Sequence, residues 1–183
     1  MRRVYYVDDD DGDAETPNVE PGPDSPARRA SVSLGNLKLT SSAFEDGGEI
    51  PRECGYKNGN EVPPLTISGE SEGTESLALI MDDPDAMGAV GKVWVHWVIW
   101  NINPDTGQVD GFIDDPEGMT DFGERGYGGP APPDKRHTYV FKLYALNIEL
   151  DLPDKSTKAD LEKAMEGHII EQATLKGTYA PDR

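Results

Sequence analysis

The sequence is poor in the features that define several common classes of protein. Its 183 residues include a single cysteine, Cys54, so no internal disulfide can form, and no Cys or His stands near it at metal-ligand spacing. No apolar run approaches the roughly 20 residues of a membrane span, and VYYV near the start is too short for a signal-peptide core. We therefore expect one soluble, cytoplasmic domain with a free thiol.

Positive charge is also scarce. The chain has 17 Lys and Arg against 35 Asp and Glu, which gives a formal net charge of −18. Such a surface repels the phosphates of nucleic acids and of anionic membranes, so we expect neither as a partner through general electrostatics. A binding site for an anion must then be local, with its own donors or its own positive charge.

Large apolar residues are nearly absent from residues 8–30, which combine an acidic run with several prolines. Such a segment buries too little surface to offset the entropy that ordering costs. We predict an acidic, proline-rich, disordered tail over residues 1–35 and a folded domain over residues 36–183.

The folded part is dense in Gly and Pro, which favours short strands joined by turns. The strongest strand patterns cover residues 77–81, 93–100 and 139–146. There is no alternation of strands with helices that would indicate parallel βαβ units. We predict a mainly β fold, a two-sheet antiparallel β-sandwich with short C-terminal helices.

The helical pattern covers residues 157–169, where Thr157 is a suitable N-cap and Gly167 is a point at which two short helices can separate. Its apolar face consists of Leu161, Ala164, Met165, His168 and Ile169. On this face, packing is the better interpretation of His168 than a ligand role.

A lone histidine, His96, interrupts the apolar run VWVHWVIW of residues 93–100. A continuous run of this length predicts a strand buried on both faces, so the imidazole should be largely out of water. From the run alone two interpretations stay open. His96 is either a core histidine with a satisfied hydrogen bond or the floor of a site.

Two further polar residues stand at the ends of apolar rows. By strand parity Asp83 shares a face with Met81, and His137 shares a face with Phe141. An inward carboxylate needs donors, because a buried unpaired charge is costly. Each residue alone has a simpler interpretation: Asp83 belongs to an acidic turn, and the loop before His137 is a connector between strands. Together with His96 they predict a pocket at one end of a sheet.

Two stretches of the chain resemble the signature regions of a known family. These are LALIMDDPDAMG followed by VWVHWVIWNI, and DFGERGYGGPAPPDKRHTYVFKLYALN. They resemble the phosphatidylethanolamine-binding protein family, in the prokaryotic branch often called Raf-kinase-inhibitor-like. The resemblance covers about residues 37–180, with the D-P-D, H-W and G-P-x-P-P…H elements in order.

The resemblance implies a Greek-key β-sandwich and a small pocket for phosphate, acetate or a phospholipid head group, in which imidazoles and loop amides donate to the anion. The pocket residues that it implies are Asp83, Asp85, His96, Gly129, Pro130, Ala131, His137 and Tyr139. The sequence departs from the family pattern at Met87, where Pro is usual, and at Thr138, where Arg is usual. It also has no Gly in the PDKRH loop.

We therefore predict a small-anion or phospho-ligand binding protein that regulates or inhibits a partner such as a kinase or protease, with no catalytic residue, cofactor or metal ion. Two alternatives stay open. One is a metal-dependent enzyme with a 2-His-1-carboxylate site, although the H-x-H spacing common in metal-binding β-barrels is absent. The other is a module that only binds proteins. A hydrolase is disfavoured, because the sequence has no G-x-S-x-G elbow.

The diffuse excess of Asp and Glu is typical of a cytoplasm with very high salt, where ions screen the repulsion between carboxylates. We therefore expect the unfolding midpoint of this protein to rise between dilute buffer and molar KCl. Thermal or denaturant unfolding across that range checks this expectation. A midpoint that stays level or falls contradicts it.

Overall fold

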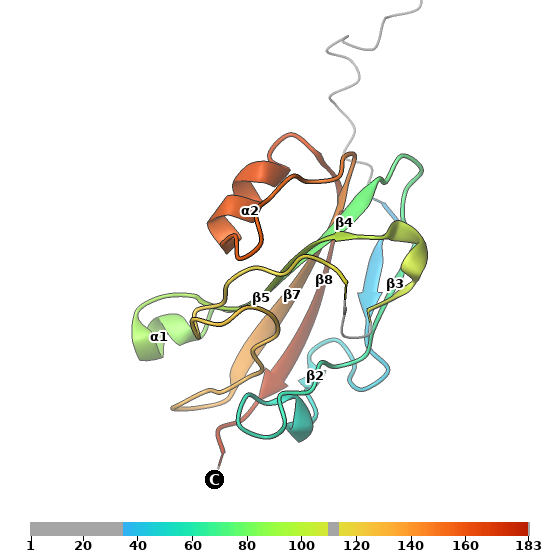
Figure 1. The fold of residues 1–183 in the computed structure, drawn as a ribbon. Coiled ribbons are helices and arrows are strands. Elements are labelled where there is room, and N and C mark those ends of the chain that lie inside the picture. The colour runs from blue at the N-terminus through green and yellow to red at the C-terminus, as the bar shows by residue number, and fades with distance from the viewer. Residues whose placement is uncertain (1–34, 110–113, 183) are drawn as a thin grey trace, which may run out of the picture. The chain divides into compact units, whose positions relative to one another are not determined.

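The computed structural model describes residues 35–109 and 114–182, so residues 1–34 of the predicted tail lie outside the described residues. Two sheets form the described part, as Figure 1 shows. The larger sheet runs β2 (Gly48–Glu49), β8 (Ile169–Tyr179), β7 (His137–Leu146), β4 (Ser76–Asp83) and β5 (Trp94–Ile102). The smaller sheet runs β1 (Lys38–Thr40), β3 (Leu65–Ser68) and β6 (Gln108–Val109).

Neighbouring strands pair antiparallel, except that β2 pairs parallel with β8. Over residues 35–109 and 114–182 the helical elements are short: α1 (Ala86–Val90), α2 (Lys158–Met165) and two 3-10 turns, Arg52–Cys54 and Pro104–Thr106. The prediction of a mainly β fold with two sheets is confirmed. Within the described residues, no helix has the length and apolar character needed to cross a membrane.

The main core lies between the two sheets. Leu39, Leu65 and Ile67 of the smaller sheet are 4%, 1% and 3% exposed, and they belong to one buried cluster with Leu79 and Phe141 of the larger sheet. Facing apolar rows of this kind supply most of the driving force for folding. Strand parity had predicted this face correctly for β4 and β7.

The other face of the larger sheet is covered by α2, which lies against β4, β5 and β7 through a second apolar cluster that includes Val98, Trp100 and Leu161. A capping box begins the helix: the Thr157 side chain accepts from the Asp160 amide, and the Asp160 carboxylate accepts from the Thr157 amide.

The predicted continuation of the helix to residue 169 is wrong. Gly167 has φ +78°, a left-handed conformation that ends a helix at little cost, and β8 begins at Ile169. In β8 the buried residues alternate, with Glu171, Leu175 and Tyr179 inward. That period of two is the signal of a strand, so one helix and a C-terminal strand replace the two short helices.

A buried carboxylate also joins the sheet to α2. Asp82 of β4 is 1% exposed, and its Oδ2 accepts from Lys158 Nζ at 2.8 Å and from Lys142 Nζ at 3.2 Å. Because Asp82 and Asp83 are consecutive strand residues, Asp82 faces α2 whereas Asp83 faces the opposite side. Only Asp83 is therefore available to a site on the core face.

We expect Lys158→Met to lower the free energy of unfolding by about 1–3 kcal/mol, because the buried Asp82 carboxylate loses its shorter charged hydrogen bond. Chemical denaturation measures this change. Lys163→Met, at an exposed position of the same helix, is the matched control. Equal stability of the two variants contradicts the structural role of this pair.

Candidate functional site

His96 reaches the core face of the sheet through an irregularity in β5. Met81 lies opposite Trp97 and Asp82 lies opposite Val95, so His96 is the extra residue of a β-bulge between them. Bulges change the direction of a side chain and are common beside functional sites. Here the imidazole packs edge-on against Phe122 and Tyr139, with ring centroids 5.3 and 5.1 Å away.

His96 is 2% exposed, and its Nδ1 lies 2.7 Å from the carbonyl oxygen of Gly128. A carbonyl only accepts, so Nδ1 carries the proton and donates it. Burial lowers the pKa of His96 below its ordinary value, against opposing effects of the Gly128 and Gly129 carbonyls and Asp83. The ring is therefore neutral at pH 7, and Nε2 presents a lone pair.

His137 is in a different state, although its side chain is fully buried. Its Nδ1 lies 2.6 Å from Asp83 Oδ2, and its Nε2 lies 2.7 Å from Asp134 Oδ1. Two carboxylates can both be satisfied only if both ring nitrogens carry protons. Burial alone lowers the pKa of His137, but the hydrogen bonds to Asp83 and Asp134 raise it above its ordinary value. The ring is an imidazolium.

Asp83 connects His137 to the start of α1. It is 3% exposed, and besides the His137 bond its Oδ1 accepts the Ala86 amide at 3.2 Å. Asp85 is exposed and points elsewhere, because its Oδ2 accepts the Thr138 amide at 2.8 Å. Asp85 therefore holds the start of β7 and does not line the cavity.

The loop before β7 is held in place by the segment around Cys54, a buried free cysteine. The Gly129 amide donates to Asn60 Oδ1 at 2.7 Å, and the Pro130 carbonyl accepts the Tyr56 amide at 2.9 Å. A Cβ on Gly129 would lie 2.0 Å from the Cys54 carbonyl oxygen, so only glycine permits this approach. The Gly129 amide is thus committed to Asn60 and is not free to donate to an anion.

Tyr139 stands behind the site with its hydroxyl buried and without a hydrogen-bond partner among the described residues. Its pKa is raised, first by burial and then by the charge of Asp83, whereas the nearby Ala131 amide opposes the shift. The hydroxyl is therefore neutral. The Tyr139 ring contacts both histidines, with its centroid 5.1 Å from that of His96 and 6.4 Å from that of His137.

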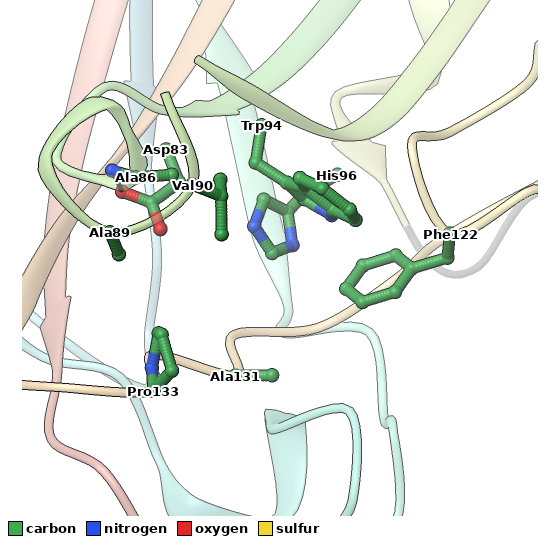
Figure 2. A pocket seen from close by; sticks show the side chains of 9 residues that line it. All are labelled: Asp83, Ala86, Ala89, Val90, Trp94, His96, Phe122, Ala131 and Pro133. Carbon is green, nitrogen blue, oxygen red and sulfur yellow. Dashed lines mark hydrogen bonds between the residues drawn. The ribbon is translucent and has the colours of Figure 1, made fainter. Parts of the chain in front are cut away.

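These elements surround a cavity of about 220 Å³. Figure 2 shows its lining: Asp83, Ala86, Ala89, Val90, Trp94, His96, Phe122, Ala131 and Pro133. The carboxylate of Asp83 and the imidazole of His96 supply its charged or ionisable side chains, and the other walls are apolar. Of the eight residues implied by the resemblance, Asp83, His96 and Ala131 line the cavity, while His137 and Tyr139 lie behind it.

Two lining residues, Phe122 and Pro133, escaped prediction because they belong to irregular segments. Phe122 comes from the loop before GYGGPAPP, stacks on Tyr56 at 4.1 Å between ring centroids and meets Trp94 edge-on at 5.5 Å. Asp134 was also missed. Its position three residues before His137 is a local signal, but only the folded loop shows that it reaches the ring.

A family model described as phosphatidylethanolamine-binding protein matches residues 40–180. The chain belongs to the phosphatidylethanolamine-binding protein family. A UPF0098 protein of Methanothermobacter thermautotrophicus is 42% identical over 151 residues, which cover 78% of this chain and 98% of that relative. A UPF0098 protein of Chlamydia muridarum is 39% identical over 150 residues, which cover 80% of this chain and 100% of that relative.

Solved structures of the phosphatidylethanolamine-binding protein family agree with this assignment. A homologue from Chlamydia trachomatis is 37% identical with a TM-score of 0.77, covering 82% of this chain and 100% of its own. YbcL of E. coli, described as a member of the mammalian family, is 29% identical with a TM-score of 0.72, covering 80% and 99%. Family membership supports a general role in ligand binding or regulation.

The site does not have the arrangement of a 2-His-1-carboxylate centre. Both nitrogens of His137 face carboxylates, and Nδ1 of His96 faces a carbonyl, so Nε2 of His96 is the single imidazole lone pair on offer. Over residues 35–109 and 114–182, no group of three or more His, Cys, Asp or Glu side chains is placed to hold a metal ion.

We expect Gly129→Ala to lower the free energy of unfolding by about 1–3 kcal/mol, because the added methyl group forces the loop away from Cys54. The same movement should shift the NMR signals of His96, whose Nδ1 depends on the neighbouring Gly128 carbonyl. Gly88→Ala, where an added Cβ meets no atom within 4 Å, is the control. An unchanged His96 spectrum in Gly129→Ala contradicts the role of the loop.

Proposed function

We propose that the cavity binds a small anion, either a phospho-ligand such as phosphate or a phospholipid head group, or a carboxylate such as acetate. The observation that carries this proposal is the buried imidazolium of His137 directly behind Asp83. In a chain of net charge −18 this ring supplies one positive charge out of water, where electrostatic interactions are strong, and it is paired there with Asp83 and Asp134. Anion binding here needs no general positive surface.

The two histidines have complementary parts in the proposed binding. His137 contributes positive charge while its two N–H groups donate to Asp83 and Asp134, whereas neutral His96 contributes an acceptor at Nε2. A ligand with both an anionic oxygen and a hydroxyl, such as a singly protonated phosphate, matches this pair. The apolar walls formed by Val90, Trp94 and Phe122 suit the carbon atoms of a head group.

A regulatory role toward a partner enzyme, such as a kinase or protease, is a second candidate. Met87 and Val90 on α1 are 54% and 51% exposed, and they are the exposed large hydrophobic residues of the described part of the chain. Val90 also lines the cavity. A partner that covers α1 would thus contact the same helix as the ligand, so ligand occupancy and partner binding would be coupled.

The test is an NMR titration of the full chain with phosphate, acetate and phosphoethanolamine while the ring signals of His96 and His137 are followed. We expect both rings to shift, and His96→Gln to weaken binding without unfolding the protein. His168→Gln is the control, since His168 bonds Asn147 away from the cavity. No shift at either ring with any of the three ligands contradicts the proposal.

The acetate titration also has an expected pH dependence. The pKa of His96 is lowered in the free protein, and a bound anion favours the protonated ring, so the pKa of His96 is higher in the complex. Binding therefore takes up a proton, and affinity for acetate rises as the pH falls through the interval between these two values. An affinity that falls with decreasing pH over that interval reverses the sign and contradicts the account.

A further inference from the structure

We infer that Asp134 is an internal competitor for the proposed ligand: its carboxylate occupies the anion position on His137 and must leave when an anion binds there. Asp134 thereby sets the anion affinity of the site. This inference rests on the proposed function, since it concerns the regulation of the same site. Its basis is the geometry around the buried ring and the difference between the two carboxylates that hold it.

The two carboxylates on His137 are not equivalent. The Asp83 side chain is 4% exposed, lines the cavity and accepts a second hydrogen bond from the Ala86 amide. The Asp134 side chain is 45% exposed and belongs to the loop that follows Pro133, itself a wall of the cavity. Asp83 is therefore held in place, whereas the Asp134 side chain can leave His137 and turn into solvent.

The charges around the ring favour such an exchange. The imidazolium carries one positive charge, and Asp83 with Asp134 carries two negative charges. His96 and Tyr139, the other titratable groups near the ring, are neutral. If Asp134 stays in place, an incoming anion adds a second excess negative charge in a buried setting. If Asp134 leaves, the incoming anion takes its place, so the net charge around the ring does not change. His137 Nε2–H is then free to donate to that anion.

The contact between Asp134 and His137 also shows which ligands would compete with Asp134 for the ring. Asp134 presents a carboxylate oxygen 2.7 Å from Nε2, the same kind of contact that acetate or a phosphate oxygen would make. A tethered group has an effective concentration of the order of millimolar. Free anions therefore bind the unmodified protein more weakly than they would bind the same site without Asp134.

The experiment measures phosphate affinity by NMR titration for the unmodified chain, Asp134→Ala and Asp134→Asn. We expect both variants to bind phosphate about tenfold more tightly, because a tethered anion and its charge have been removed. Asp151→Asn, which makes the same charge change at an exposed residue far from the ring in the sequence, should stay within about twofold. In the unmodified chain, saturating phosphate should also shift the Asp134 carboxyl carbon.

The outcomes separate this inference from the proposed function. If the unmodified chain binds phosphate at His96 and His137 but the Asp134 variants bind no more tightly, the competitor role is overturned and the proposed function stands. If no form of the protein binds phosphate, acetate or phosphoethanolamine, both are overturned. If neither Asp134 variant keeps a cooperative unfolding transition, the carboxylate is a structural part of the site, and the competitor role is overturned.

Discussion

The candidate site depends on the hydrogen-bonded ion pair between Asp83 and His137. Neither side chain tolerates burial alone, because an unpaired charge out of water is costly. Their pairing at 2.6 Å fixes the end of β4 against the start of β7. From this point Asp83 also accepts the first amide of α1, which carries Ala86, Ala89 and Val90 to the cavity. The wall of the cavity that α1 forms thus depends on one buried pair.

His96 has a different protonation state from His137 because its surroundings differ. His137 has two carboxylates, whereas His96 has a carbonyl and aromatic rings, so burial outweighs attraction in His96 and attraction outweighs burial in His137. Two titratable groups whose environments drive their pKa values apart are a recurrent feature of functional sites. Here the result is a donor and an acceptor on one side of the sheet, in a protein whose surface is otherwise acidic.

Strand parity in the sequence correctly predicted the face of the sheet on which Asp83 and His137 lie, because both stand in regular parts of their strands. Strand parity gave the wrong face for His96, because it groups this residue with Val98 and Trp100 under α2. The β-bulge places His96 on the other face. Asp134 and Phe122 belong to loops, where no periodicity exists to assign a direction. The helix at residue 158 was predictable from its cap, but β8 was missed because its apolar residues continue the helical spacing.

His137 and His96, both buried, have different protonation states in the unliganded protein, and the proposed binding depends on this difference. The most direct measurement is the imidazole ¹⁵N spectrum of the full chain, labelled at histidine, at neutral pH. We expect both ring nitrogens of His137 to carry protons and His96 to carry one proton, on Nδ1. A neutral His137, or a His96 with its proton on Nε2 or on both nitrogens, would contradict this expectation.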